Sequence, residues 1–176
     1  MKSNDHIISS LNDLIRVNND RTEGYEKAIK NLEAGDVDLK AIFSRMADQS
    51  RQFASELASE VVKQGGEPAT GTTASGKIYR MWMDVKATFS GDDRQAMLNS
   101  CEFGEDAILN AYSAAKEMHN DFSSDQAELI QQHKAMLQES HDLIKQYRDH
   151  NKVTDAEAPK EAFKSNIRNN ERRDML

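Results

Sequence analysis

One glutamate stands out because it lies on an otherwise apolar helical face. In the segment CEFGEDAILNAYSAAKEMH, residues 101–119, helical spacing places Glu105 on one stripe with Cys101, Ile108, Tyr112 and Ala115. A carboxylate on the buried face of a helix is costly unless it is paired with a charge, hydrogen-bonded or bound to a metal. Any chemistry in the core therefore depends on what Glu105 contacts.

His141 is the second candidate, because it lies on the apolar stripe of the segment 123–150. Helical bundles that bind two irons use one Glu from each of two helices and Glu-x-x-His from each of the other two. Side chains at i and i+3 can reach the same metal pair because they share one helix face. The sequence therefore raises the hypothesis of an iron or manganese site containing Glu105 and His141.

The other ligand positions of that pattern hold residues poorly suited to iron: Asn18, Ser50, Phe53 and Gln138. Two divalent irons need several carboxylates to offset their charge, and Glu105 is the only carboxylate that the whole ligand pattern finds in this sequence. We therefore expect a buried polar network in which the neutral side chains and His141 hydrogen-bond to Glu105. This expectation includes no catalytic residue and no cofactor.

The alternative is a metal site completed by further side chains near the apolar stripes. The candidates for this role are Glu26, Asp48, Glu102 and His133. Acids at the edge of a stripe are ordinarily solvated, and a lone histidine on an apolar face is more often a core residue than a ligand. An oxidoreductase with an unusual metal centre ranks last.

Long amphipathic segments must position these residues. The chain of 176 residues has only 8 Gly and 2 Pro, which favours helices. Apolar periodicity predicts four of them. They cover residues 3–33, 37–64, 92–119 and 123–150. Gly35-Asp36 should end the first helix and cap the second, and Ser123 with Gln126 forms a capping-box pattern at the start of the fourth.

The second and third helices are separated by a long connection, residues 65–91. It begins with the helix-breaking segment GGEPATGTTASG and continues with KIYRMWMDVKATF, which predicts a short helix over residues 77–89. A connection of this length can travel the length of a bundle. The predicted fold is an all-α, ferritin-like four-helix bundle over residues 1–150, with a long crossover that carries an extra short helix. Residues 151–176 form a charged tail, partly disordered or a short helix.

Composition excludes several classes of function. The net charge is −7 and no segment is densely basic, so binding to nucleic acid is not expected. The single cysteine, Cys101, cannot form an intramolecular disulfide. No apolar run approaches the roughly 18 residues of a membrane span, and the first residues lack the apolar core of a signal peptide. These features predict a cytoplasmic protein without a membrane segment.

Four segments of the sequence resemble a bacterial family of ferritin-like four-helix-bundle proteins of unknown function. They are LNDLIRVNNDRTEGYEKAI from residue 11, FASEL from residue 53, YRMWMDVKATFSGDD from residue 79 and CEFGEDAILNAY from residue 101. The resemblance covers about residues 3–149 and implies a ferritin-like fold, but little about activity. More distant relatives, the bacterioferritins and rubrerythrins, bind two irons between the helices. When the ligand pattern of these relatives is carried over to this sequence, only Glu105 and His141 have the expected residue type.

Taken together, these features predict a non-catalytic ferritin-like bundle with a degenerate di-iron site. We expect it to form a homo-oligomer, most simply a dimer, and to serve a stress-related or partner-binding role. Binding of iron or manganese through Glu105 and His141 with nearby carboxylates is the alternative.

Overall fold

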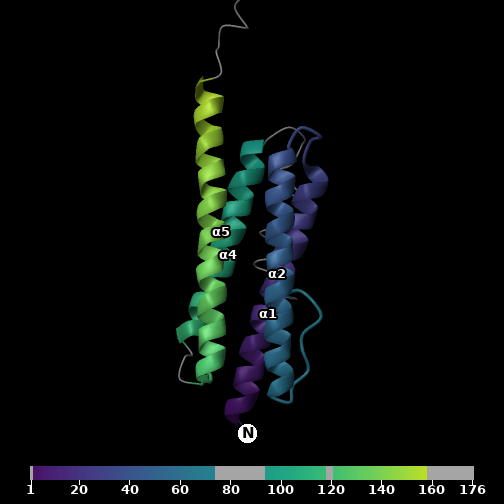
Figure 1. The fold of residues 1–176 in the computed structure, drawn as a ribbon, viewed down its shortest axis with the longest axis vertical. Coiled ribbons are helices and arrows are strands. Elements are labelled where there is room, and N and C mark those ends of the chain that lie inside the picture. Colours follow the sequence, from purple (N-terminus) through teal and green to yellow (C-terminus); the bar gives the residue numbers. More distant parts are fainter. Residues whose placement is uncertain (1, 74–93, 118–120, 158–176) are drawn as a thin grey trace, which may run out of the picture.

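Four helices form the bundle in the computed structural model, which describes residues 2–73, 94–117 and 121–157. In chain order they are α1 (Lys2–Asn31), α2 (Val37–Lys63), α4 (Arg94–Glu117) and α5 (Ser124–Glu157). They lie side by side, with α1 and α5 running in one direction and α2 and α4 in the other (Figure 1). The described residues contain no strand, which confirms the predicted all-α four-helix bundle. None of the described helices is long and apolar enough to span a membrane.

The connection between α2 and α4 has to return along the bundle. Because α2 and α4 run in the same direction, α2 ends at the opposite end of the bundle from the start of α4 (Figure 1). A crossover of this kind distinguishes the ferritin-like topology from an up-down-up-down bundle. The short helix predicted over residues 77–89 lies outside the described residues.

The first part of the crossover is fastened to α1 through its main chain. Asn12 donates from Nδ2 to the carbonyl oxygen of Glu67 (3.0 Å) and accepts at Oδ1 from the N–H of Ala69 (2.7 Å). Further along α1, Asn19 donates to the carbonyl oxygen of Gly71 (2.9 Å). Polar side chains of α1 therefore satisfy backbone groups of the crossover.

The glycine pair that follows α2 ends the helix as a Schellman motif. Gly65 has a φ of 77°, the left-handed conformation that glycine adopts without steric cost. Its N–H donates to the carbonyl oxygen of Val62 (2.9 Å), and the N–H of Gly66 donates to that of Val61 (3.0 Å). These two bonds satisfy carbonyl groups that the end of a helix leaves without partners.

The capping box predicted for α5 is confirmed. The N–H of Gln126 donates to Oγ of Ser123 (3.3 Å), and the N–H of Ser123 donates to Oε1 of Gln126 (3.1 Å). This reciprocal pair fixes the point at which the chain turns from α4 into α5.

The capping role predicted for Asp36 is wrong. Asp36 occupies the N-cap position of α2, but its side chain makes no capping hydrogen bond. Its carboxylate pairs instead with Arg94 (2.5 Å), which also binds Asp38 (2.7 Å). The charged pairing with Arg94 fixes the start of α4 against the start of α2.

Helix α5 continues to Glu157, beyond the end predicted near His150. Two side-chain contacts with α4 lie on either side of the predicted end. Asn151 donates to Oε1 of Gln95 (3.1 Å), and Arg148 pairs with Glu102. The last turns of α5 extend past the ends of the other helices (Figure 1).

The apolar core is divided into two clusters along the bundle axis. One cluster comprises Leu11, Leu14, Ile15, Val17, Phe53, Leu57, Val61, Ile108, Tyr112, Ala115, Ile130 and Leu137. The other comprises Tyr25, Ala28, Leu39, Phe43, Met46, Ala47, Met97, Leu98, Cys101 and Ile144. On every helix the two clusters are separated by about two turns, and this stretch carries at least one buried polar residue.

Candidate functional site

A polar layer crosses the middle of the bundle between the two apolar clusters. Each helix supplies one residue: Arg21 from α1, Ser50 from α2, Glu105 from α4 and Ser140 from α5. Arg21 is 1% exposed, Ser50 and Glu105 are 0% exposed, and Ser140 is 5% exposed. The predicted burial of Glu105 is confirmed, and the charged side chain beside it is Arg21.

Arg21 and Glu105 form a bidentate ion pair. The guanidinium donates from Nε to Oε1 of Glu105 (2.7 Å) and from Nη2 to Oε2 (3.1 Å). Its Nη1 donates to Oγ of Ser50 (2.9 Å) and to the carbonyl oxygen of Met46 (3.1 Å). Every nitrogen of the guanidinium therefore has an acceptor, which is the condition under which a buried ion pair is tolerated.

Two more groups surround the carboxylate of Glu105. Tyr25 donates its hydroxyl proton to Oε1 (2.5 Å), and its ring centroid lies 5.3 Å from Cζ of Arg21. Burial, and then the negative charge of Glu105, raise the pKa of Tyr25 well above its ordinary value. The same two causes raise the pKa of the Cys101 thiol. Both groups are therefore protonated at neutral pH, and Cys101 is a core thiol rather than a nucleophile.

The charge of Arg21 is maintained in spite of its burial. Removal from water acts to lower its pKa and is the largest single effect. The attraction of Glu105 opposes it, and with the charge-assisted hydrogen bonds the pKa of Arg21 is raised overall. Arg21 and Glu105 are thus a charged and mutually neutralising pair.

Gln49 links this pair to the surface of the bundle. Its Oε1 accepts from Nη1 of Arg21 (3.0 Å) and from Oγ of Ser140 on α5 (3.0 Å). Gln49 is half-buried, so one side chain connects the core charge with the seam between α2 and α5.

These residues do not fit a di-iron centre. Both oxygens of Glu105 are engaged by Arg21 and Tyr25, and a metal there would face a fixed guanidinium cation. Asn18 Oδ1 is the one buried oxygen near this level without a hydrogen-bond partner in the described structure, and it carries no charge. In the same described residues, no three His, Cys, Asp or Glu side chains converge as metal ligands.

A second buried polar chain joins all four helices one to two turns away. Asn18 donates to the hydroxyl oxygen of Tyr112 (2.8 Å), which lies 3.2 Å from Nδ1 of His133. Nε2 of His133 lies 2.6 Å from Oε2 of Glu56, and its ring stacks on Phe53 at 3.9 Å. The chain therefore runs from a fully buried tyrosine to a carboxylate that is 38% exposed.

The hydrogen bonds define the state of His133. Burial lowers its pKa, and the hydrogen bond that the ring donates to Glu56 opposes this effect only in part, so the ring is neutral at pH 7. A carboxylate can only accept, which assigns the ring proton to Nε2. Nδ1 then accepts from the hydroxyl of Tyr112, and His133 has both nitrogens satisfied.

The prediction that His141 contacts Glu105 is wrong. Nε2 of His141 lies 3.0 Å from Asp106, and Nδ1 lies 3.1 Å from Asp142, at the rim of the bundle. Gln138 is exposed and contacts the same rim group. Ser140 and His141 lie three and four residues after the buried Leu137, so helical geometry allows either of them to face the core. In the structure Ser140 is the buried one of the two.

The predicted additional ligands are placed in separate contacts, three in ion pairs and His133 in a hydrogen bond. Glu26 and Asp48 both bind Arg51 on the outer surface of α1 and α2. Glu102 binds Arg148, and His133 binds Glu56 as described above. The structure brings none of these four side chains into contact with Glu105 through a hydrogen bond or ion pair of the described residues.

Arg21 is the residue that the sequence interpretation missed. A step of four residues from Asn18, which is the step that the sequence interpretation takes, leads to Thr22, and a further step of three leads to Tyr25. Arg21 lies three residues after Asn18 and four before Tyr25, so it fits the same face equally well. The sequence did contain a signal for this ion pair. Arg21 is a basic residue on the core face of its helix, and another helix carries a glutamate on its own core face.

The fold of this chain is that of the ferritin-like proteins. The bacterioferritin of Desulfovibrio desulfuricans, described with a diiron site, is 20% identical, with a TM-score of 0.73 over 86% of this chain and 83% of that chain. A mutant of Mycobacterium smegmatis Dps1 is 14% identical, with a TM-score of 0.69 over 84% and 97% of the respective chains. The dodecameric thioferritin of Bacteroides fragilis is 15% identical, with a TM-score of 0.68 over 89% and 92%. At these identities the similarity establishes the fold alone.

The family assignment is more specific than the fold. The model of the family described as "Domain of unknown function (DUF2383)" matches residues 6–118, and the chain belongs to this family. The resemblance noted in the sequence is thereby confirmed. A search of the curated proteins found no match.

Replacing Arg21 by methionine should destabilise the protein strongly. Arg21→Met keeps much of the side-chain volume but leaves the charge of Glu105 buried and unpaired, which should lower the free energy of unfolding by about 3–5 kcal/mol. Urea denaturation measures this change. His141→Ala is the matched control and should cost less, because His141 contacts rim acids. The double variant Arg21→Met/Glu105→Leu should recover most of the loss, and equal costs for the two single variants would contradict the assignment.

Stability should fall as the pH drops through the titration range of His133. Because burial holds the folded-state pKa below the unfolded value of about 6.5, the unfolded chain binds more protons as the pH falls below 6.5. The contribution of His133 is therefore complete above this pH and is lost toward the folded-state pKa. Melting temperatures between pH 7.5 and about 5.5 should decline less steeply in His133→Gln. The exposed His6→Gln is the control, and equal slopes in all three proteins would refute the prediction.

Proposed function

We propose that this protein is a non-catalytic ferritin-like bundle in which an internal arginine provides the positive charge that a metal would otherwise supply. The observation that carries the proposal is the bidentate ion pair between Arg21 and Glu105. The Desulfovibrio bacterioferritin has a diiron site on the same fold. Here the core glutamate is neutralised by the chain itself, which supports a bundle that is stable without an ion.

Because the charges in the core neutralise each other, we assign the biological role to the surface of the bundle. Tyr25 and Cys101 are protonated, and Glu105 has no free oxygen, so the polar layer offers neither a nucleophile nor a general base. A partner-binding or stress-related role is consistent with this arrangement.

Metal binding through Glu105 and His141 is the second candidate. It is favoured by the position of His141 next to two carboxylates, those of Asp106 and Asp142. It would require Arg21 to release Glu105, which would leave a guanidinium unpaired in the core.

Metal analysis separates the two functions. Protein from cells grown with added iron and manganese should contain no stoichiometric metal, and it should not accelerate the oxidation of ferrous iron by oxygen. Elemental analysis should give the same result for the variant Glu105→Ala/His141→Ala. A bacterioferritin purified in parallel is the positive control for loading. About one or more equivalents of metal in the wild-type protein, lost in the variant, would overturn the proposal in favour of metal binding.

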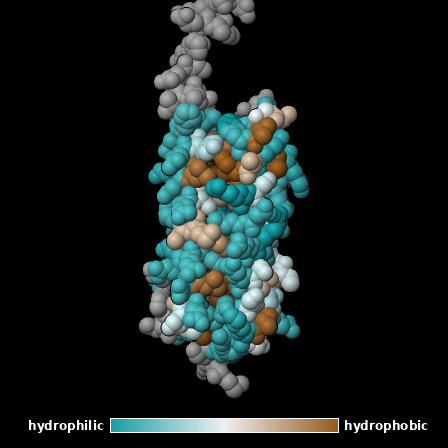
Figure 2. All heavy atoms as spheres, in the orientation of Figure 1, coloured by the Kyte–Doolittle hydropathy of each residue, from teal (hydrophilic) through white to brown (hydrophobic). Residues whose placement is uncertain are grey.

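The proposal includes self-association as a dimer. The face drawn in Figure 2 is mainly hydrophilic, with separate apolar patches. Four large apolar residues of the described chain are exposed, and Phe103 on α4, 51% exposed, is the aromatic one. Exposed aromatic side chains are frequent anchors of protein interfaces.

Sedimentation velocity tests the dimer. The wild-type protein should sediment as a dimer, and Phe103→Glu should shift it to a monomer, because a charge would be buried at the contact. Val37→Glu is the matched control, since Val37 is 68% exposed at the start of α2. A wild-type protein that remains monomeric at all concentrations would remove self-association from the proposal.

A further inference from the structure

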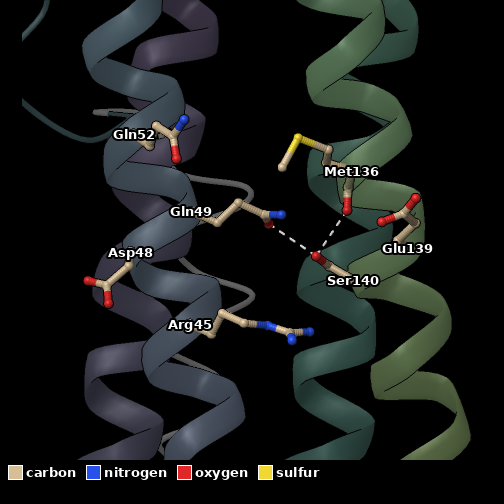
Figure 3. Close-up of a pocket in the computed structure, with 7 residues that line it drawn as sticks. All are labelled: Arg45, Asp48, Gln49, Gln52, Met136, Glu139 and Ser140. Carbon is tan, nitrogen blue, oxygen red and sulfur yellow. Dashed lines mark hydrogen bonds between the residues drawn. The ribbon is translucent and has the colours of Figure 1, made fainter.

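A polar groove of about 440 Å³ lies between α2 and α5. Four of its lining side chains extend into the space between the helices in Figure 3: Arg45, Gln49, Met136 and Ser140. Gln52 and Glu139 also line the groove, and they lie over their own helices at its edge. The volume is within the range of sites that bind small molecules.

The floor of the groove is fixed by the polar layer. Oε1 of Gln49 accepts from Nη1 of Arg21 and from Oγ of Ser140, each at 3.0 Å, so the amide is held from the inside and from α5. Its Nε2 has no hydrogen-bond partner in the part of the chain that the structure describes. An amide oriented in this way offers its N–H groups to the groove.

The two walls carry opposite charges that do not touch. Arg45 extends from α2 toward α5, and Glu139 stands on α5 (Figure 3). Neither side chain has an ion-pair or hydrogen-bond partner among the described residues, and no ion pair joins them to each other. Asp48 also borders the groove, but it points away from α5 and binds Arg51 (2.5 Å).

We propose that this groove binds a small zwitterion of the free amino acid class. The carboxylate of the ligand lies against Arg45 and Nε2 of Gln49, because a guanidinium and an amide N–H are matched donors for a carboxylate. The ammonium lies against Glu139, and an apolar side chain lies against Met136. The ligand thus completes the charge pairing that the two walls leave open.

The groove meets the polar layer through Gln49 and Ser140, whereas its charged walls, Arg45 and Glu139, make no hydrogen bond or ion pair with Arg21 or Glu105 in the described residues. Its ligand-contacting groups belong to α2 and α5 at the surface, whereas the proposed function rests on Arg21 and Glu105. A metal-binding result would overturn the proposed function and leave the groove to be judged by its own experiment.

The first test is a thermal-shift panel of the free L-amino acids on the full chain, followed by calorimetry of the one that stabilises most. Two analogues of this amino acid are titrated in parallel. One lacks the amino group and keeps the carboxylate, and the other lacks the carboxylate and keeps the amine. We expect saturable one-to-one binding of the amino acid, roughly tenfold tighter than either analogue. If no amino acid binds, or if the carboxylate analogue binds as tightly as the amino acid, the proposal is overturned.

Variants of the two walls test the assignment of charges. Arg45→Ala and Glu139→Ala should each weaken binding roughly tenfold. Arg51→Ala is the matched control, because Arg51 is an exposed arginine of the same helix that binds Glu26 and Asp48 instead. Circular dichroism confirms that the variants fold. Unchanged affinity in either wall variant, or an equal loss in the control, would refute the site.

Discussion

The buried charge of Glu105 is the constraint on which the rest of this bundle depends. An apolar stripe specifies which face of a helix is buried, but it permits neighbouring helices to slip by a turn, about 5.4 Å. Such a slip would separate the carboxylate of Glu105 on α4 from the guanidinium of Arg21 on α1 and leave two unpaired charges in the core. The ion pair therefore fixes the register of α1 against α4, a role that is well attested for buried polar groups.

The same pair also determines what surrounds it. A guanidinium has more donors than one carboxylate can use, so α2 contributes Ser50, the carbonyl group of Met46 and the amide oxygen of Gln49. That amide then requires its own alignment, which Ser140 of α5 provides. One charge in the centre thus organises side chains from all four helices, and its influence reaches the surface through Gln49.

The four long helices, their order and most of their ends could be predicted because they depend on local signals. The glycine pair after α2 and the Ser123–Gln126 box acted as the sequence indicated. The two main errors in the site share one cause. A period of 3.6 residues leaves steps of three and four equally allowed, and Arg21 against Thr22 and Ser140 against His141 are such choices. The type of side chain favoured the wrong residue in both cases. Thr22 was preferred because arginine is rarely fully buried, and His141 was preferred because histidine is a frequent metal ligand. Only tertiary packing decides which step is used.

The attachment of the crossover to α1 has a consequence for how this segment can change. Asn12 and Asn19 bind peptide groups of residues 67–71 and not their side chains. Every amino acid except proline offers the same peptide donor and acceptor. The path of this segment along α1 is therefore specified by the helix, whereas the identities of its residues are nearly unconstrained by these bonds. This stretch can diversify in sequence, or carry grafted peptides, while the course of the chain stays the same.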